Sequence, residues 1–370
     1  MTQSLALING GVAYAAGDAL PAATVNAWTA NTELAWANAV ARMSPAVWVS
    51  SGWSSVGKWA NGYIHALVLD SGATYSIKTL ATGETFSDVV LALSMTDEGA
   101  MTICFNAGVG TWGAWPLGAS THSYLSNDET LGAWAQSTGV YFSALAAVSV
   151  GTKYFVAGKN ATVGAVRRYT AATMALDSTF ASSYANEFSD IASDGSSGVV
   201  AVSADGAART TNGGTTWTAA ALTAPAGAYG YPSVNWLASL SLYICSWLLD
   251  TGALAYSTSS TGATWTSWQV TSQVVIALSI LPGISAPMVG IIAIGNTLVA
   301  PYVDDASQLG VMLSADGGAS WHIGDCCTQI SSLDYLRTIA CGNMAAVVSL
   351  NTVAFSGYIA SNDKENSVAL

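Results

Sequence analysis

The chain has 370 residues, of which 51% are hydrophobic and only 9% are charged, and its formal net charge is −12. Ten Lys and Arg residues are too few to build a basic stripe that neutralises phosphates, so nucleic acid is excluded as the main partner. The mean hydropathy of +0.42 is high, yet no apolar run reaches the roughly 20 residues that a membrane-spanning helix needs. The apolar stretch at 274–294 contains two Pro and two Gly residues, and it predicts two strands around a loop.

Residues 1–46 do not share the pattern of the rest of the chain. They begin without a basic region or a cleavage site, so no secretory signal is expected. Pro21 opens a predicted helix that runs to about residue 43, because Pro suits the first helical turn. Apolar side chains follow helical spacing on this helix and form a candidate anchor to another subunit: Val25, Trp28, Trp36 and Val40. The alternative is a helix that packs against the chain's own body.

An eight-residue turn motif recurs through residues 47–370. The clearest copies are TTNGGTTW at 210–217 and SADGGASW at 314–321. Weaker copies occupy 258–265 and 79–86, and three degenerate ones begin at residues 126, 173 and 361. Asn, Asp and Gly supply the positive φ angles of a tight turn, and the Thr and Trp that follow suit a strand. The copies begin 37 to 56 residues apart, which is the spacing of propeller blades. The sequence therefore predicts an all-β fold: a seven-bladed β-propeller of four-stranded blades, with a short N-terminal helical segment.

The predicted blades can be placed along the chain. The first blade would have its innermost strand at 47–50, then strands at 63–69 and 73–78, with the fourth from about residue 85. The last blade would use 335–340, 345–350 and 353–359, with 367–370 or the segment near 5–8 as the outer strand that closes the ring. Cys104 and Cys245 are expected on second strands as buried, reduced thiols.

The repeated motif resembles the Asp-box of sialidase-type propellers, whose pattern is Ser/Thr-x-Asp-x-Gly-x-Thr-Trp. The resemblance covers roughly residues 47–370 and implies a turn between the third and fourth strand of each blade. Because the box occurs in hydrolases and in proteins without enzymatic activity, it indicates architecture and not chemistry. One aromatic residue of each box is expected to pack between neighbouring sheets: Phe86, Trp134, Phe180, Trp217, Trp265 and Trp321.

A second resemblance lies in residues 15–26, AAGDALPAATVN. This stretch is similar to one found near the start of many bacteriophage tail-fibre and other virion proteins, with Pro21 in place of the usual Thr. Together with the low-charge body rich in Gly, Ala, Ser, Thr and Trp, it implies a phage structural protein.

The residues do not predict an active site. A sialidase needs three converging arginines, but the five arginines of this chain are scattered and the family's arginine signature is absent. The candidate carboxylate pairs, Asp97 with Glu98, Asp128 with Glu129, Glu187 with Asp190 and Asp304 with Asp305, are adjacent in loops and are typical of solvated turns. The three His residues stand apart, without metal or triad spacing. We therefore expect no catalytic residue, no cofactor and no metal.

Binding surfaces are a better prospect. Trp112 and Trp115 lie in a Gly-rich stretch, 106–118, that is predicted to be a loop between a second and a third strand. Such tryptophans could stack on sugar rings or contact a protein, and the alternative is that both fold back over their own blade. Tyr229 with Tyr231, in the link at 224–232, and Trp53 with Trp59 are further aromatic candidates.

The function expected from these observations is a non-catalytic structural protein of a bacteriophage particle. It would be a tail, spike or head-associated component that forms a symmetric homo-oligomer, contacts other virion proteins and binds a host-surface glycan. Its location would be the virion, assembled in the host cytoplasm. The alternative is a glycan-binding or glycan-hydrolysing Asp-box propeller of cellular origin. A flat or plugged loop face would favour the first, and a deep central pocket with converging carboxylates would favour the second.

Overall fold

A computed structural model describes residues 101–126, 134–281 and 287–324 of the chain, together with isolated strands before and after them. Those strands lie at 7–9, 12–14, 48–49, 58–60, 63–70, 74–81 and 87–93, and at 328–329, 336–341, 344–348 and 352–355. The predicted helix at 21–43 lies outside the described residues. Among the described residues, no helix is long and apolar enough to cross a membrane.

The described strands form antiparallel sheets that follow one another along the chain, and within each sheet most strands pair with the strand next to them in sequence. The first sheet contains Lys58–Ala60 (β4), Tyr63–Asp70 (β5), Thr74–Ala81 (β6) and Ser87–Leu93 (β7). The next is seven-stranded: Met101–Asn106 (β8), Thr111–Pro116 (β9), Gly118–Ser126 (β10), Ala135–Val150 (β11), Lys153–Asn160 (β12), Val163–Thr170 (β13) and Leu176–Ala181 (β14). The third contains Phe188–Ser193 (β15), Val199–Ser203 (β16), Gly206–Thr210 (β17) and Thr218–Ala220 (β18).

The remaining sheets repeat this order. The fourth contains Ser233–Leu237 (β19), Leu242–Leu248 (β20), Ala253–Ser259 (β21) and Gln269–Val274 (β22). The fifth has Ile292–Ile294 (β23), Thr297–Val303 (β24), Gln308–Ser314 (β25) and His322–Ile323 (β26), with Thr328–Gln329 (β27) also paired to β25. The last consists of Arg337–Cys341 (β28), Met344–Val348 (β29), Thr352–Phe355 (β30) and Trp48–Val49 (β3). Leu7–Asn9 (β1) and Val12–Tyr14 (β2) pair only with each other.

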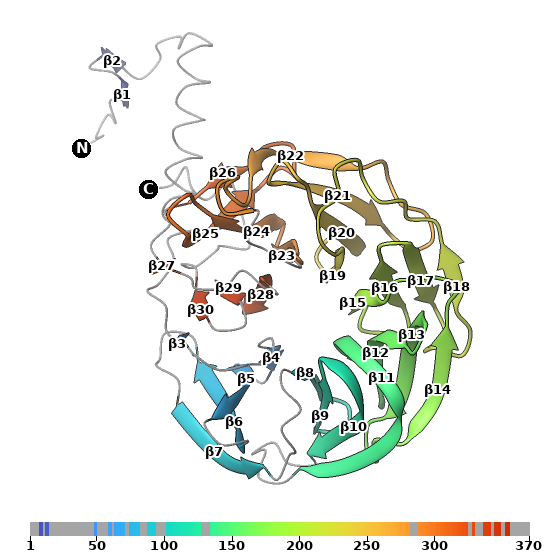
Figure 1. Cartoon of the computed structure of the whole chain (residues 1–370). Coiled ribbons are helices and arrows are strands. Elements are labelled where there is room, and N and C mark those ends of the chain that lie inside the picture. The colour runs from blue at the N-terminus through green and yellow to red at the C-terminus, as the bar shows by residue number, and fades with distance from the viewer. Residues whose placement is uncertain are drawn as a thin grey trace, which may run out of the picture.

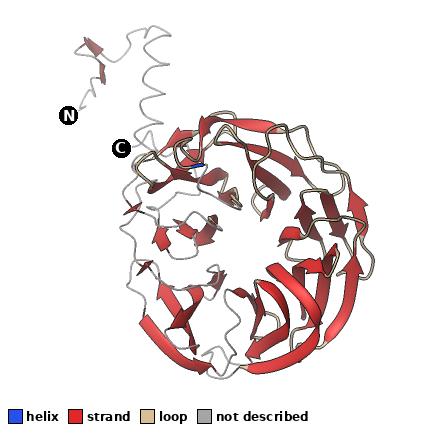
Figure 2. Cartoon of the chain, viewed as in Figure 1, coloured by secondary structure: helices blue, strands red, loops and turns tan. Residues whose placement is uncertain are grey.

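These sheets are arranged as a β-propeller. Figure 1 shows them around a closed ring, with the first strand of each sheet toward the middle and the last toward the outside, and Figure 2 shows how completely strands make up the described part. Neighbouring inner strands contact one another around the whole ring, from β4 through β8, β11, β15, β19, β23 and β28 back to β4. The predicted all-β propeller class is therefore confirmed.

Strand β11 joins two parts of the ring in one element. Its residues 135–144 pair with β10, as an outer strand does, while 143–150 pair with β12, as an inner strand does. Because β11 is continuous, the strands on both sides of it belong to one seven-stranded sheet. The described strands therefore make six separate sheets around the ring. The number of seven blades stays a prediction.

The way in which the ring closes corrects the expected strand order. Trp48 and Val49 were expected in the innermost strand of the first blade, but as β3 they pair with Val353 and Thr352 of β30, at the outer edge of the last sheet. The innermost strand of the first sheet is instead β4. Leu7 and Ile8 pair with β2 and do not close the ring. The apolar run at 47–50 is too short to show a side-chain periodicity. Its sequence therefore does not indicate whether it joins the first sheet or the last.

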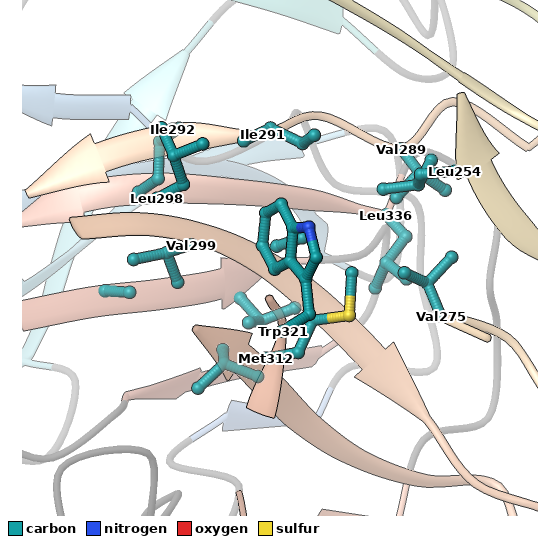
Figure 3. Packing of buried hydrophobic residues seen from close by; sticks show 14 of the residues in the cluster. Leu254, Val275, Val289, Ile291, Ile292, Leu298, Val299, Met312, Trp321 and Leu336 are labelled. Carbon is teal, nitrogen blue, oxygen red and sulfur yellow. The ribbon is translucent and has the colours of Figure 1, made fainter. Parts of the chain in front are cut away.

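The core lies between neighbouring sheets. The largest cluster of buried side chains spans β20 to β29, and Figure 3 shows the indole of Trp321 among Val275, Met312 and Leu336. Trp217 stacks on Phe180 of the preceding sheet, with ring centroids 5.3 Å apart. The expected packing of box aromatics between sheets is thus confirmed for these positions. Phe86 lies outside the described residues.

The repeated turns at 210–217, 258–265 and 314–321 connect the third and fourth strands of their sheets, and short polar side chains hold them. The copy predicted at 173–180 is not such a turn, because residues 176–181 form β14. The buried hydroxyl of Thr210 accepts a hydrogen bond from the Gly214 N–H (3.0 Å), and Asn212 Oδ1 accepts one from the Thr216 N–H (3.0 Å). Ser314 accepts a bond from the Gly318 N–H in the same way (2.8 Å). In the copy predicted at 258–265, Gly262 donates the corresponding bond, but the acceptor is Ser259 and not Thr258 (2.8 Å).

Each of these turns is attached to the preceding sheet. Arg168 of β13 donates a hydrogen bond to the carbonyl of Gly213 (2.6 Å), Arg209 of β17 to that of Thr261 (3.3 Å), and Tyr256 of β21 to that of Gly318 (3.1 Å). The turn motif therefore fixes the contact between neighbouring sheets as well as its own hairpin.

Candidate functional site

Trp112 and Trp115 are not on a loop. The turn lies at 107–110, between the first and second strands, and residues 111–116 form β9. Both indoles are in the core, with exposed fractions of 1% and 2%. The glycines misled the loop prediction: Gly113 lies inside the strand, where a Cβ atom would be 2.3 Å from Cη2 of Trp115. Glycine is needed there because the indole folds back over the backbone. The alternative interpretation holds, and these residues do not form a ligand surface.

Tyr229 and Tyr231 lie in the link between the third and fourth sheets and are half-buried. The hydroxyl of Tyr229 donates to the carbonyl of Leu281 (3.3 Å), and its side chain packs against the largest core cluster. The N–H of Tyr231 donates to the carbonyl of Pro287 (3.0 Å). This link holds two sheets together, and the structure does not bring it near Trp112 and Trp115 in one surface.

The other candidates are only partly described. Trp59 lies in β4, of which the structure describes the backbone, and Trp53 lies outside the described residues. The proposed anchor residues, Val25, Trp28, Trp36 and Val40, also lie outside them. Their predicted roles stay predictions.

Of the carboxylate pairs, those that the structure describes are held in structural hydrogen bonds. Asp304 Oδ1 accepts hydrogen bonds from the N–H groups of Ala306 and Gln308, which makes it a turn residue. Asp190 is buried on β15 and accepts a bond from Ser233 Oγ (2.7 Å), whereas Glu187 is half-buried. Cys104 and Cys245 are buried and do not form disulfides, although Cys104 lies on a first strand and not on a second. In the described part of the chain, no group of three or more His, Cys, Asp or Glu residues could hold a metal ion.

A hollow of about 90 Å³ opens where β10 and β11 face β13 and β14. It arises from an irregularity in pairing: Ser120 pairs with Phe142 and His122 with Thr138, so three residues of β11 stand opposite Thr121 alone. Such a bulge re-aims side chains and disrupts the ladder locally. Here it leaves Val140 and Tyr141 exposed, by 63% and 47%. Polar side chains line much of the hollow: Ser120, Thr121, His122, Ser123, Ser137 and Thr138.

Arg167 forms part of the wall of this hollow and is only 4% exposed. Its two terminal nitrogens donate hydrogen bonds to the bulge carbonyls of Val140 (2.6 Å) and Tyr141 (2.8 Å). Its guanidinium lies 4.4 Å from the centre of the Phe142 ring, within the range of a cation–π contact. The arginine thus fixes the shape of the bulge from beneath.

The same wall contains Tyr169, which lies deep in the sheet. Burial raises the pKa of its phenol, and Arg167 opposes that shift through a side-chain hydrogen bond with the phenol and through its positive charge, both of which favour the phenolate. The phenol therefore stays protonated near neutral pH. Exposed Leu176 of β14 adds an apolar flank.

The hollow combines hydroxyls, an imidazole, a buried cation and apolar flanks that include a tyrosine ring. Such a set can bind a polar ligand by hydrogen bonds and by contact with its apolar faces. Little in the sequence indicates this hollow, because its lining comes from four strands and spans residues 120 to 176. A signal that could have been noticed is Arg167, a charged residue that directly follows the apolar run at 163–166.

Neither a protein-family model nor a curated protein matches the chain. Solved structures do match. One is YCF48 bound to a D1 peptide, with 14% identity, a TM-score of 0.49, and coverage of 86% of this chain and 94% of that one. Two others are complexes of a mutant Aleuria aurantia lectin, one with Fucα1-6GlcNAc and one with α-methyl-L-fucoside. Each is 11% identical and covers 78% of this chain and 99% of the other, with TM-scores of 0.46 and 0.45. At these values the likeness carries no argument about ligands, and the resemblance to the Asp-box family stays a prediction.

Proposed function

We propose that the chain is a non-catalytic binding protein whose propeller presents the hollow between β10–β11 and β13–β14 to a glycan. The observation that carries this proposal is the lining of the hollow, where the hydroxyl side chains of β10 and β11 converge in one small space with the ring of Tyr169. Sugars are bound in proteins by hydrogen bonds to hydroxyls and by an aromatic face against the sugar ring. Glycan surfaces are also compatible with a protein in which only 9% of residues are charged.

Binding of the full-length chain to an array of immobilised glycans tests this proposal. A glycan that binds should bind roughly tenfold more weakly to Thr138→Val and to Ser137→Ala, each of which removes one hydroxyl from the hollow. Thr218→Val is the matched control, because Thr218 is exposed on β18, outside the hollow. Equal binding by all four proteins would place the glycan elsewhere. Cleavage of a bound glycan would favour the hydrolytic alternative instead.

We further propose that this binding protein belongs to a bacteriophage particle, as a tail, spike or head-associated component. The support is the stretch at residues 15–26 and the apolar stripe that follows it in the sequence. The oligomeric mass of the full chain, measured beside that of a chain starting at residue 47, tests the assembly role of residues 1–46. A defined oligomer that becomes a monomer on truncation is the expected result. Two monomers would contradict self-assembly through this segment.

A further inference from the structure

Arg167 is a buried cation for which the described residues provide no carboxylate partner. Its neighbour on β13 differs: Arg168 pairs with Asp177 (2.9 Å), and Lys153 pairs with the same carboxylate (2.9 Å). Arg167 lies on the other face of the strand and has two backbone carbonyls and the Phe142 ring instead. Burying a charge is costly unless it is paired, and carbonyl dipoles compensate for only part of that cost.

One donor of this guanidinium also lacks an acceptor. Nε of Arg167 is buried and has no hydrogen-bond partner among the described residues, although the two terminal nitrogens have theirs. Buried donors are nearly always satisfied in folded proteins, so an unsatisfied one in the wall of a hollow points to an acceptor that comes from outside the chain.

The size of the hollow limits what that acceptor can be. A space of about 90 Å³ corresponds to roughly three water molecules. This is room for a carboxylate or a sulfate group, but not for a whole monosaccharide. The rest of a sugar would remain at the rim, where Thr138 offers a hydroxyl and the exposed Val140 and Leu176 offer apolar surface.

We infer that the hollow selects glycans that carry an oxyanion, a carboxylate or a sulfate ester, with Arg167 as the residue that recognises the charged group. The inference rests on the proposed function and adds to it the class of ligand. It also gives a role to the buried Arg167 in a chain whose net charge is −12. A chain with this charge would repel acidic glycans unless a cation attracted them locally.

The test compares sugars that differ only in the anionic group: galactose, galacturonate and galactose 6-sulfate, and glucose with glucuronate. Inorganic sulfate alone is included to measure the contribution of the anion. The full-length protein should bind at least one acidic sugar tenfold or more tightly than its neutral counterpart. Arg167→Gln should abolish this preference. Arg209→Gln should retain it, because Arg209 also donates to a carbonyl but lies outside the hollow.

The outcomes separate this inference from the proposal on which it rests. Equal affinity for acidic and neutral sugars, or a preference that survives in Arg167→Gln, overturns the oxyanion inference and leaves glycan binding in place. No binding to any sugar or glycan removes both. Should Arg167→Gln not fold, the side-chain Nε–H resonances of the five arginines in the unaltered protein provide a second measurement. One resonance should shift when the preferred acidic sugar is added, and five unmoved resonances would overturn the inference.

Discussion

At the scale of single residues, Gly113 shows how one missing side chain shapes the core. Its hydrogen faces the Trp115 ring, and a Cβ atom there would lie 2.3 Å from that ring. Gly113→Ala should therefore displace the indole and destabilise the protein by about 1–3 kcal/mol. Thermal unfolding measures this loss. Gly139→Ala is the control, because the nearest atom to its Cβ is 3.8 Å away. Equal melting temperatures for the two variants would contradict the packing described.

Asp316 makes the fifth sheet's turn sensitive to acid. Burial raises the pKa of its carboxyl, but hydrogen bonds from Ser320 and Ser314 outweigh this and hold the pKa at about 2. A carboxylate whose folded pKa lies below its unfolded value stabilises the protein above the unfolded value, and this stabilisation is lost as the pH falls through the folded value. The melting temperature should therefore fall between about pH 4 and pH 2.

Asp316→Asn isolates this contribution, since Asn212 holds the equivalent position in another turn. The amide keeps the acceptor for the Ser320 N–H but does not titrate. The acid-induced fall should thus be smaller in the variant than in the unaltered protein. Parallel melting curves over this pH range would show that Asp316 does not contribute.

At the scale of the structural element, the turn at 210–217 depends on one hydroxyl. Thr210 Oγ1 accepts hydrogen bonds from the N–H groups of Gly214 (3.0 Å) and Asn212 (3.3 Å). Thr210→Val keeps the shape of the side chain and leaves the buried Gly214 N–H unsatisfied, which should cost about 1–3 kcal/mol. Thr210→Ser should cost much less, because Ser314 fulfils this role in the later turn. Urea unfolding of both variants gives the comparison, and an equal loss in both would exclude the hydroxyl as the cause.

The same turn shows why the sequence predicts elements of this fold better than its site. The turn motif, the inner strands and the packing of Trp217 could all be read from local patterns, because each depends on residues that are close in sequence. The pairing of β3 with β30 and the bulge of β11 could not, because they depend on contacts between distant segments. The candidate site depends mostly on such contacts between segments that are distant in sequence. Trp112 and Trp115 were misplaced because glycine marks close contacts inside strands as well as turns.

At the scale of the whole molecule, strand pairing closes the ring. Among the described residues, Trp48 and Val49 of β3 cover the edge of β30, and an uncovered strand edge is both less stable and prone to pairing with other chains. A chain that starts at residue 57 should therefore melt at a lower temperature and aggregate more readily than one that starts at residue 47. Calorimetry and light scattering measure the two effects. Identical behaviour of the two chains would show that β3 does not stabilise the closed ring.

The continuity of β11 has a consequence for binding. In a ring whose sheets are joined only by loops, neighbouring sheets can shift against each other, and a site between them must be ordered each time a ligand arrives. Here one strand belongs to both sides, and the bulge that shapes the hollow is part of that strand. The walls are thus preorganised, so a ligand loses little free energy in arranging them.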